Sequence, residues 1–447
     1  MNVKVQTFLV LGVSKSGYYA SKFLLEKNAK CYIYEDYKNP KVDGAIEELI
    51  SLGAIRVERK NIDDILSVID VLIISPGVKI NHEIAVKAKK NGIRIISEFE
   101  FAFLSLSPEI IAVTGTNGKT TTVNLINEIY QKANYNSMLC GNVGVPVSQI
   151  INEVKRDTIL IAEVSSFQLE STNAFCPHIS CVLNIAPDHL ERHFTMENYI
   201  FLKKRIFKNQ RESEYTVLNY DDVVVRNFNS ETKGKIVWVS TREKVDGAYA
   251  LDKKIYYKGD FIMDVDKLVI KGEHNIQNAL FSIAVAKIDN ISNDVITDAL
   301  STFKGIEHRV QFIDKINGVS FYNDSKATNT ASCISALNSV EGQIILILGG
   351  KDKGEAYDDL MEKIKLRPIK HVVIYGETRH KIANCAVSHG INDVTITSKF
   401  NNALRISAIL AEDGDSILLS PACSSLDEFS SYEERGRVFT SFVESLK

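Results

Sequence analysis

The residues best suited to chemistry form the run Thr-Gly-Thr-Asn-Gly-Lys-Thr-Thr at positions 114–121. The apolar residues 110–113 before it predict a buried strand, and the residues after it predict a helix. A glycine-rich loop between the two aims backbone N–H groups and a helix N-terminus at one point, which suits a polyphosphate. Lys119 would add positive charge for the terminal phosphates, and the hydroxyl of Thr120 would bind Mg²⁺. The usual phosphate loop has a glycine where this chain has Val113.

Two further polar side chains follow apolar runs that predict neighbouring strands. Glu163 ends the run 159–162, and a carboxylate beside a phosphate loop is a suitable ligand for a nucleotide-bound Mg²⁺. His189 comes after the next such run, and Asp188 could orient its ring. His193 is the weaker candidate and is expected at the surface.

Three more segments carry polar groups in chemically suggestive patterns. By composition, the run Lys203 to Arg205 predicts a solvated helix face. Asn275 and Asn278 lie three residues apart on one helical face, where their amides can contact a purine edge, although helix capping is an equal alternative for Asn275. Farther on, three charged side chains form a set that could grip a nucleotide and a second substrate: Arg309, Asp324 and Lys326.

Short apolar strands and amphipathic helices alternate over the first hundred residues, which predicts a parallel, Rossmann-like sheet. The turn 12–17 lacks the middle glycine of the dinucleotide fingerprint, so it is weak evidence for NAD. The helix N-terminus that follows could still meet a nucleotide diphosphate, together with Ser14, Lys15 and Ser16. Asp36 after the second strand could contact a ribose or base, or serve only as a turn residue.

The complete pattern is α/β in three domains. We expect a Rossmann-like domain at 1–106, a central domain with the phosphate loop and a parallel or mixed sheet at 107–308, and a Rossmann-like C-terminal domain at 309–447.

Composition excludes several classes of protein. The 447 residues carry a net charge of −3 without a basic stripe, so nucleic acid is not an expected partner. The apolar runs are too short to span a bilayer, and the N-terminus has no signal-peptide pattern. Seven scattered cysteines without a Cys-x-x-Cys pair predict reduced thiols in the cytoplasm.

Four segments in order resemble the Mur ligases along the whole chain. They are the phosphate loop, Glu-Val-Ser-Ser-Phe-Gln-Leu-Glu at 163–170, Asn-Asp-Ser-Lys-Ala-Thr-Asn at 323–329, and Ser-Pro-Ala-Cys-Ser-Ser-Leu-Asp-Glu-Phe at 420–429. The last three favour the family member that adds D-glutamate to UDP-N-acetylmuramoyl-L-alanine. The resemblance implies that ATP phosphorylates the substrate carboxylate, and that the amine then attacks the acyl phosphate through a tetrahedral intermediate. It also implies a monomer in the cytoplasm.

The resemblance assigns roles to individual residues. Thr120 and Glu163 would hold one Mg²⁺, and His189 with a carbamylated Lys203 a second. Asn142 would meet substrate or transition-state oxygens. ATP would contact Gly115, Thr116, Asn117, Gly118, Lys119, Thr120, Thr121, Asn275, Asn278, Arg309 and Asp324. The UDP substrate would contact Ser14, Lys15, Ser16, Asp36, Ser75, Pro76, Gly77, Asn142 and Gln168. D-glutamate would contact Lys326, Thr328, Ser425, Tyr432 and Lys353, with Lys351 as the alternative to Lys353.

Four other interpretations stay open from sequence. A sister Mur ligase would add another amino acid, and a regulator could keep the scaffold without catalysis. A folylpolyglutamate synthase would normally lack the first domain. An NAD-dependent dehydrogenase would not need a phosphate loop of the ATP type.

Overall fold

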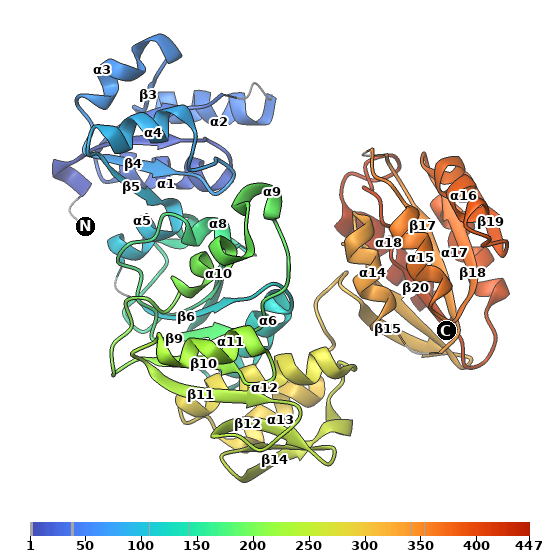
Figure 1. The fold of residues 1–447 in the computed structure, drawn as a ribbon. Helices are drawn as coiled ribbons and strands as arrows, with labels where there is room; N and C mark the ends of the chain where they lie inside the picture. The colour runs from blue at the N-terminus through green and yellow to red at the C-terminus, as the bar shows by residue number, and fades with distance from the viewer. Residues whose placement is uncertain (1–2, 37–39, 107, 143, 341, 353) are drawn as a thin grey trace. The chain divides into compact units, whose positions relative to one another are not determined.

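The computed structural model describes residues 3–36, 40–106, 108–142, 144–340, 342–352 and 354–447. The chain forms two compact units (Figure 1). Unit 1 comprises Met1–Leu268 and Glu273–Thr302, and unit 2 comprises Val269–Gly272 and Phe303–Lys447. Unit 1 contains two sheets and unit 2 contains one. Among the described residues, no helix has the length and apolar character needed to cross a membrane.

The first sheet is parallel, with strand order β3-β2-β1-β4-β5. Its strands are near-continuous apolar runs because helices cover both faces. Helices α1, α2 and α5 pack on one face, and α3 and α4 on the other. The bounds are β1 (Thr7–Leu11), α1 (Lys15–Glu26), β2 (Lys30–Tyr34), α2 (Pro40–Ser51), β3 (Ile55–Arg56), α3 (Ile62–Leu66), β4 (Val71–Ile74), α4 (Glu83–Lys90), β5 (Arg94–Ser97) and α5 (Glu98–Ser105).

The turn between β1 and α1 needs glycine for a steric reason. A Cβ at Gly17 would lie 1.9 Å from the carbonyl oxygen of Gly12, so a side chain there would block the turn. The hydroxyl of Ser75, which follows β4, donates to the same oxygen at 2.7 Å. The turn and the loop after β4 are therefore packed together at the carboxyl end of this sheet.

The second sheet has nine strands in the order β14-β13-β12-β11-β10-β9-β6-β8-β7. Pairing is parallel from β7 to β12, and β13 and β14 add antiparallel strands at one edge. The strand bounds are β6 (Glu109–Thr114), β7 (Ser137–Gly141), β8 (Ile159–Glu163), β9 (Ile179–Val182), β10 (Tyr215–Asn219), β11 (Lys235–Ser240), β12 (Gly247–Leu251), β13 (Lys254–Tyr257) and β14 (Asp260–Asp264). The helix bounds are α6 (Lys119–Lys132), α7 (Val147–Ile150), α8 (Ser166–Leu169), α9 (Leu190–His193), α10 (Met196–Lys204), α11 (Val223–Arg226), α12 (Glu273–Ile288) and α13 (Asn293–Thr302).

Helices α6 and α12 pack along one another although about 140 residues separate them in sequence. The hydroxyl of Thr122 on α6 donates to Oδ1 of Asn278 on α12 at 3.2 Å. At the other end of the pair, the hydroxyl of Tyr130 donates to Asp289. The helix that starts at the phosphate loop is thus held by a helix from the end of unit 1.

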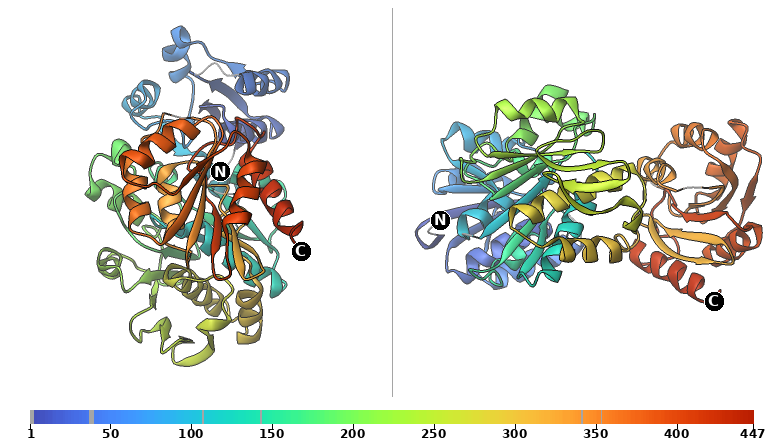
Figure 2. Two further views of the ribbon diagram at one scale, coloured as in Figure 1. Left: turned by 90° about the vertical axis from the view of Figure 1, so that its right-hand side faces the viewer. Right: turned by 90° about the horizontal axis from the view of Figure 1, so that it is seen from below.

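The third sheet lies in unit 2 and has strand order β15-β16-β20-β17-β18-β19. Its pairing is parallel apart from the β15–β16 hairpin. Helices α14, α15 and α16 cover one face, and α17 and α18 the other (Figure 2). The bounds are β15 (Gln311–Ile316), β16 (Val319–Asn323), α14 (Thr330–Leu337), β17 (Ile344–Gly349), α15 (Asp358–Lys365), β18 (Ile369–Tyr375), α16 (Arg379–Ser388), β19 (Val394–Ile396), α17 (Phe400–Leu410), β20 (Ser416–Leu419) and α18 (Tyr432–Glu444). The three sheets confirm the α/β class expected from sequence.

Candidate active site

The phosphate loop joins β6 to α6 at the carboxyl end of the central sheet. Gly118, directly before α6, has a φ of +84°, in the left-handed region. A Cβ at this position would lie 2.4 Å from Oδ1 of Asn278, so the turn accepts only glycine. Lys119 folds back along the loop, and its Nζ donates to the carbonyl oxygens of Gly115 and Thr116 at 2.9 and 2.7 Å. The loop and its lysine therefore have the strand–loop–helix geometry that the sequence predicts.

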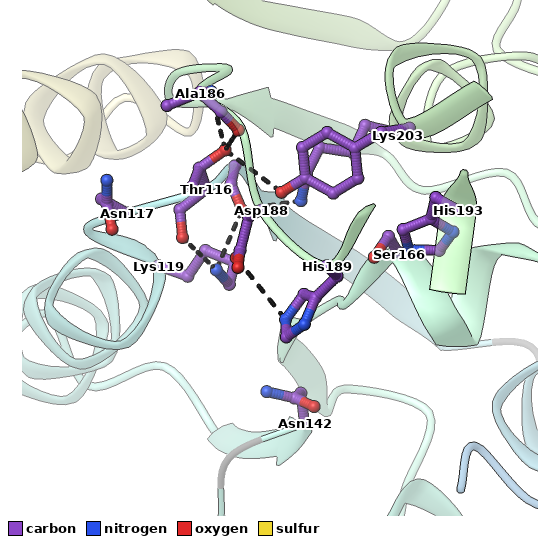
Figure 3. Close-up of polar contacts among 12 residues, drawn as sticks. Thr116, Asn117, Lys119, Asn142, Ser166, Ala186, Asp188, His189, His193 and Lys203 are labelled. Atoms are coloured by element: carbon purple, nitrogen blue, oxygen red, sulfur yellow. Dashed lines mark hydrogen bonds and ion pairs between the residues drawn. The ribbon is translucent and has the colours of Figure 1, made fainter. Parts of the chain in front are cut away.

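The end of β9 fixes the shape of this loop. The backbone N–H groups of Thr116 and Asn117 donate to the carbonyl oxygen and Oδ1 of Asn184, at 3.0 and 2.8 Å. The N–H of Ala186 donates to the hydroxyl of Thr116, which also lies 3.1 Å from the hydroxyl of Tyr199 (Figure 3). The segment that carries His189 is thus tied directly to the phosphate loop.

Glu163 brings three of the predicted residues together. Its carboxylate is buried at the end of β8. The hydroxyl of Thr120 donates to Oε2 at 2.8 Å, and Nδ2 of Asn142 donates to Oε1 at 2.9 Å. A buried carboxylate beside a hydroxyl and the phosphate loop supplies the hard oxygen ligands that Mg²⁺ requires, so these residues fit a nucleotide-bound Mg²⁺.

Lys203 is buried, which contradicts the solvated face predicted from composition. It lies on the last turn of α10 with 2% of its surface exposed. Its Nζ donates to the carbonyl oxygen of Gly115 at 2.7 Å and lies 4.8 Å from the centre of the Tyr199 ring. Burial and then the charge of Lys119 lower the pKa of Lys203 to about 7. Tertiary packing against the phosphate loop therefore overrides the local composition.

The two histidines of this segment have different environments. His189 is about half exposed, has a φ of +53°, and lies 3.5 Å from the carboxylate of Asp188 (Figure 3). His193 was expected at the surface but is buried, with Nε2 3.0 Å from the hydroxyl of Ser166 and Nδ1 3.5 Å from Glu170. The single turn of α9 turns the His193 ring inward, and burial lowers its pKa.

Asn275 and Asn278 share one face of the first turns of α12. Nδ2 of Asn278 donates to Oδ1 of Asn275 at 3.2 Å. Asn275 lies inside the helix, which begins at Glu273, so it is not the cap residue. Because Asn278 also borders Gly118, the pair lies next to the start of the phosphate-loop helix.

The residues predicted to contact the UDP substrate lie in the first sheet's domain, apart from Asn142 and Gln168. Ser14 and Lys15 are exposed at the start of α1, and Ser16 is half-buried. Asp36 accepts a hydrogen bond from the hydroxyl of Tyr34 and lies 2.7 Å from Nε2 of His82. Pro76 and Gly77 follow the buried Ser75 in the loop after β4.

Gln168 has a local structural function. Its Oε1 accepts from the N–H of Ser165 at 2.9 Å, and its own N–H donates to the Ser165 hydroxyl at 3.3 Å. This reciprocal capping box starts α8 and buries the Gln168 side chain.

Within unit 2, the predicted residues gather around the loops after β16 and β20. Asp324 is buried and accepts from the hydroxyl of Ser420 at 2.6 Å and from the N–H of Val310 at 3.2 Å. Burial raises the pKa of Asp324 to about 7. Nζ of Lys326 lies 5.8 Å from the centre of the Tyr432 ring.

The other predicted residues of unit 2 vary in exposure. Arg309 is exposed, Thr328 is half-buried and Ser425 is buried. The backbone of Lys351 pairs with Ser424, next to Ser425. Lys353 lies outside the described residues.

Sequence reasoning missed Arg435, which organises this part of unit 2. The side chain is fully buried. Its guanidinium donates to the hydroxyl and carbonyl oxygens of Ser325, the hydroxyl of Tyr375 and the carbonyl oxygen of Cys423. An arginine within an amphipathic helix pattern gave no signal that it would be buried.

Sequence reasoning also missed the acids that join the first sheet's domain to the central one. Glu98 is buried and accepts from the N–H of Ser148 at 2.9 Å. Glu100 accepts from three consecutive N–H groups, those of Asn173, Ala174 and Phe175. The acidic residues in the sequence Glu-Phe-Glu-Phe were the available signal, because charges inside an apolar helix need partners.

Models of known protein families match most of the chain. The Mur ligase MurD-like N-terminal domain matches residues 6–97, the Mur ligase middle domain 113–286, and the Mur ligase glutamate ligase domain 308–423. The chain belongs to the Mur ligase family. Similar Mur ligases include proteins named UDP-N-acetylmuramoylalanine–D-glutamate ligase from Thermoanaerobacter sp. (strain X514), 40% identical, and Clostridioides difficile (strain 630), 39% identical. Both matches cover 100% of each chain.

Solved Mur ligase structures share the fold at lower sequence identity. MurF from Acinetobacter baumannii has a TM-score of 0.61 and 17% identity, with 92% of this chain and 91% of that chain covered. MurC from Thermotoga maritima has a TM-score of 0.58 and 16% identity, with 99% and 100% covered. These likenesses support the three-domain α/β architecture alone.

Proposed function

We propose that this chain joins the carboxylate of UDP-N-acetylmuramoyl-L-alanine to the amine of D-glutamate, with conversion of ATP to ADP and phosphate, in peptidoglycan precursor synthesis. The substrates come from the name shared by the relatives that match the chain over its full length. The structural observation that carries the proposal is the cluster around Glu163, where Thr120 and Asn142 bond one buried carboxylate beside the phosphate loop.

The first step transfers the terminal phosphoryl group of ATP to the substrate carboxylate and leaves ADP. Such a transfer depends on positioning and on neutralising charge, because little covalent chemistry falls to the protein. Lys119 and the N-terminus of α6 provide positive potential at the phosphate loop. Thr120 and Glu163 would hold Mg²⁺, which supplies further stabilisation of the transferring phosphoryl group. Asn142 would contact the substrate oxygens from the same edge of the sheet.

The depressed pKa of Lys203 supports the carbamylation that the family resemblance implies. With a pKa of about 7, roughly half of the amine is neutral at pH 7, whereas an ordinary lysine is almost entirely charged. A neutral amine can add to CO₂ and release a proton, which converts the side chain to an anionic oxygen ligand. Together with His189 it would hold a second Mg²⁺. Turnover by Lys203→Ala that a small carboxylic acid partly restores would support this assignment.

The second step is attack of the D-glutamate amine on the acyl phosphate, which gives a tetrahedral intermediate and then releases phosphate. Two carboxylates on the incoming amino acid call for cations and hydroxyls, which unit 2 offers in Lys326, Thr328, Ser425, Tyr432 and one of Lys351 or Lys353.

For ATP we propose Asn275 and Asn278 with Arg309 and Asp324. For the UDP substrate we propose Ser14, Lys15, Ser16, Asp36 and the loop Ser75–Gly77, with Asn142 and Gln168 from the central domain. We further propose a monomer that works in the cytoplasm, where ATP and UDP-sugars are made.

The decisive experiment measures ATP-dependent phosphate release with UDP-N-acetylmuramoyl-L-alanine and one of four amino acids: D-glutamate, L-glutamate, L-alanine or a diamino acid. Turnover restricted to D-glutamate is the expected result. Turnover with a different amino acid would make the chain a sister ligase. A folded protein that binds ATP but turns over none of them would be a regulator on the ligase scaffold.

A further inference from the structure

Arg192 connects the two domains of unit 1 at the edge where the proposed substrates meet. It lies on α9, three residues after His189. Its Nε and Nη2 donate to the two carboxylate oxygens of Glu170 at 3.0 and 2.7 Å. Its Nη1 and Nη2 also donate to the carbonyl oxygens of Pro76 and Val78 in the first sheet's domain, at 3.2 and 3.1 Å. One side chain therefore holds a carboxylate of the central domain and two backbone oxygens of the other.

The Pro76–Val78 loop lies at the carboxyl end of the first sheet, where we propose that the UDP substrate binds. Ser75 donates to the carbonyl oxygen of Gly12, and a Cβ at Gly12 would lie 2.8 Å from Cγ2 of Val78. Any displacement of this loop would consequently disturb the turn between β1 and α1. Arg192 therefore contacts this turn indirectly, through the loop Pro76–Val78.

On the other side, Arg192 is linked to His189 in two ways. The N–H of Arg192 donates to the carbonyl oxygen of His189 at 3.0 Å. The guanidinium carbon lies 4.1 Å from the centre of the Phe167 ring, and the ring of His189 lies 4.8 Å from the same centre. The φ of +53° at His189 is unfavourable for a residue with a side chain and persists only where neighbouring structure holds it.

Burial makes this arrangement sensitive to the identity of the side chain. The side chains of Arg192 and Glu170 are 10% and 9% exposed. The planar guanidinium makes four hydrogen bonds in fixed directions, and a lysine ammonium cannot reproduce that fork. Compared with apolar side chains of similar volume a buried pair of this kind adds little net stability, whereas removal of one partner alone is costly.

We propose that Arg192 is a positioning residue. It fixes the position of the loop 75–78, which we propose to contact the UDP substrate, relative to the turn that carries His189. It would set the substrate carboxylate at the correct distance from the phosphate loop without contacting a substrate itself. The inference rests on the proposed function, because its readout is the ligase reaction.

The test compares Arg192→Met and Arg192→Lys with the wild type and with Arg226→Lys. Arg226 is a matched control because it is a half-buried arginine of the same domain that stacks 5.0 Å from the centre of the Tyr220 ring. For Arg192→Met we expect kcat to fall and KM for the UDP substrate to rise, each by about tenfold or more, since a misplacement of about 1 Å can cost a hundredfold. Arg192→Lys should recover part of both losses, and Arg226→Lys should match the wild type. The dissociation constant for ATP should change little in either Arg192 variant. The melting temperature should fall in Arg192→Met, which leaves the buried carboxylate of Glu170 without its arginine partner, and should fall less in Arg192→Lys.

Two results would overturn the proposal. One is an Arg192→Met enzyme with kcat and KM for the UDP substrate within twofold of the wild type. The other is a loss of ATP affinity that equals the loss of UDP-substrate affinity in both Arg192 variants, which is the signature of a structural role alone. Failure of the proposed function is distinguishable, because the wild-type enzyme would then show no turnover. In that case calorimetric binding of the UDP substrate to wild type and Arg192→Met decides the positioning role.

Discussion

Because the amine of Lys203 is buried, we expect that replacing this residue of the proposed machinery stabilises the fold at neutral pH. Its pKa of about 7 lies about 3.5 units below the ordinary value of 10.5, and each unit corresponds to about 1.4 kcal/mol. At pH 7 the charged amine therefore costs the folded state about 4 kcal/mol. Lys203→Met removes this cost but also loses the hydrogen bond to Gly115, which contributes about 1–2 kcal/mol. We expect a net gain of about 2–3 kcal/mol, together with loss of ligase activity.

The pH dependence has a definite sign. Because the folded pKa is the lower one, the unfolded chain binds more protons between about pH 7 and 10.5, so the stability of the wild type rises with pH across this window. The advantage of Lys203→Met should accordingly be largest near pH 7 and should disappear near pH 10.5. Below pH 7 the difference should be constant.

Urea unfolding can measure this effect on the stability of the central domain. The chain has a single tryptophan, Trp238, which lies on β11 of the central sheet and reports on unfolding of that domain. Buffers free of CO₂ and Mg²⁺ keep the amine unmodified. Lys208→Met is the control, because Lys208 is exposed on the segment just after α10. If the midpoints of Lys203→Met and the wild type differ by the same amount from pH 7 to 10, the amine is not depressed in pKa and the reasoning fails.

Three further predictions test other parts of the molecule. Gly118→Ala should cost clearly more stability than Gly53→Ala, since both glycines have positive φ but only the first would place a Cβ 2.4 Å from Asn278; equal losses of about 1 kcal/mol in thermal unfolding would contradict the steric argument. Glu163→Gln should lower phosphate release by about a hundredfold or more and raise the Mg²⁺ concentration needed, because an amide is a weaker metal ligand than a carboxylate; an unchanged Mg²⁺ titration would exclude Glu163 as a ligand. The raised pKa of Asp324 means that the wild type loses stability as pH rises through about 7, so Asp324→Asn should be the more stable protein at pH 8, by up to about 4 kcal/mol, and the gap should close near pH 4. Melting temperatures that respond to pH in parallel would refute that assignment.

Sequence reasoning succeeded where the location of a residue in the fold follows from its position along a strand. Glu163 was singled out because parallel strands deliver their carboxyl-end residues to one edge, whereas Asn142 came only from the family resemblance; the structure joins the two side chains directly. The phosphate loop was found because glycine spacing and the flanking apolar pattern are local properties. The same holds for the three-domain α/β class.

Sequence reasoning failed where the environment of a side chain depends on distant elements. Nothing in the residues around Lys203 or His193 indicates burial, since the phosphate loop and α8 that cover them lie far away in sequence. Arg192 and Arg435 were missed for a similar reason: each is a charged residue on a helix, and each has partners more than a hundred residues away in sequence. The local sequence pattern identifies residues at the edge of a sheet, whereas the burial of a charged side chain can be recognised only in the assembled fold.

The pairing of α6 with α12 has a consequence for how the protein is made. The phosphate loop emerges from the ribosome about 160 residues before Asn278, the residue that abuts Gly118 and accepts from Thr122. Until α12 is synthesised, the face of α6 that carries Thr122 and Tyr130 lacks this covering helix, so the phosphate-loop helix is incompletely packed. A chain that stops before α12 would contain every residue of the phosphate loop and still lack the support that shapes it. We therefore expect nucleotide binding only after α12 has been made.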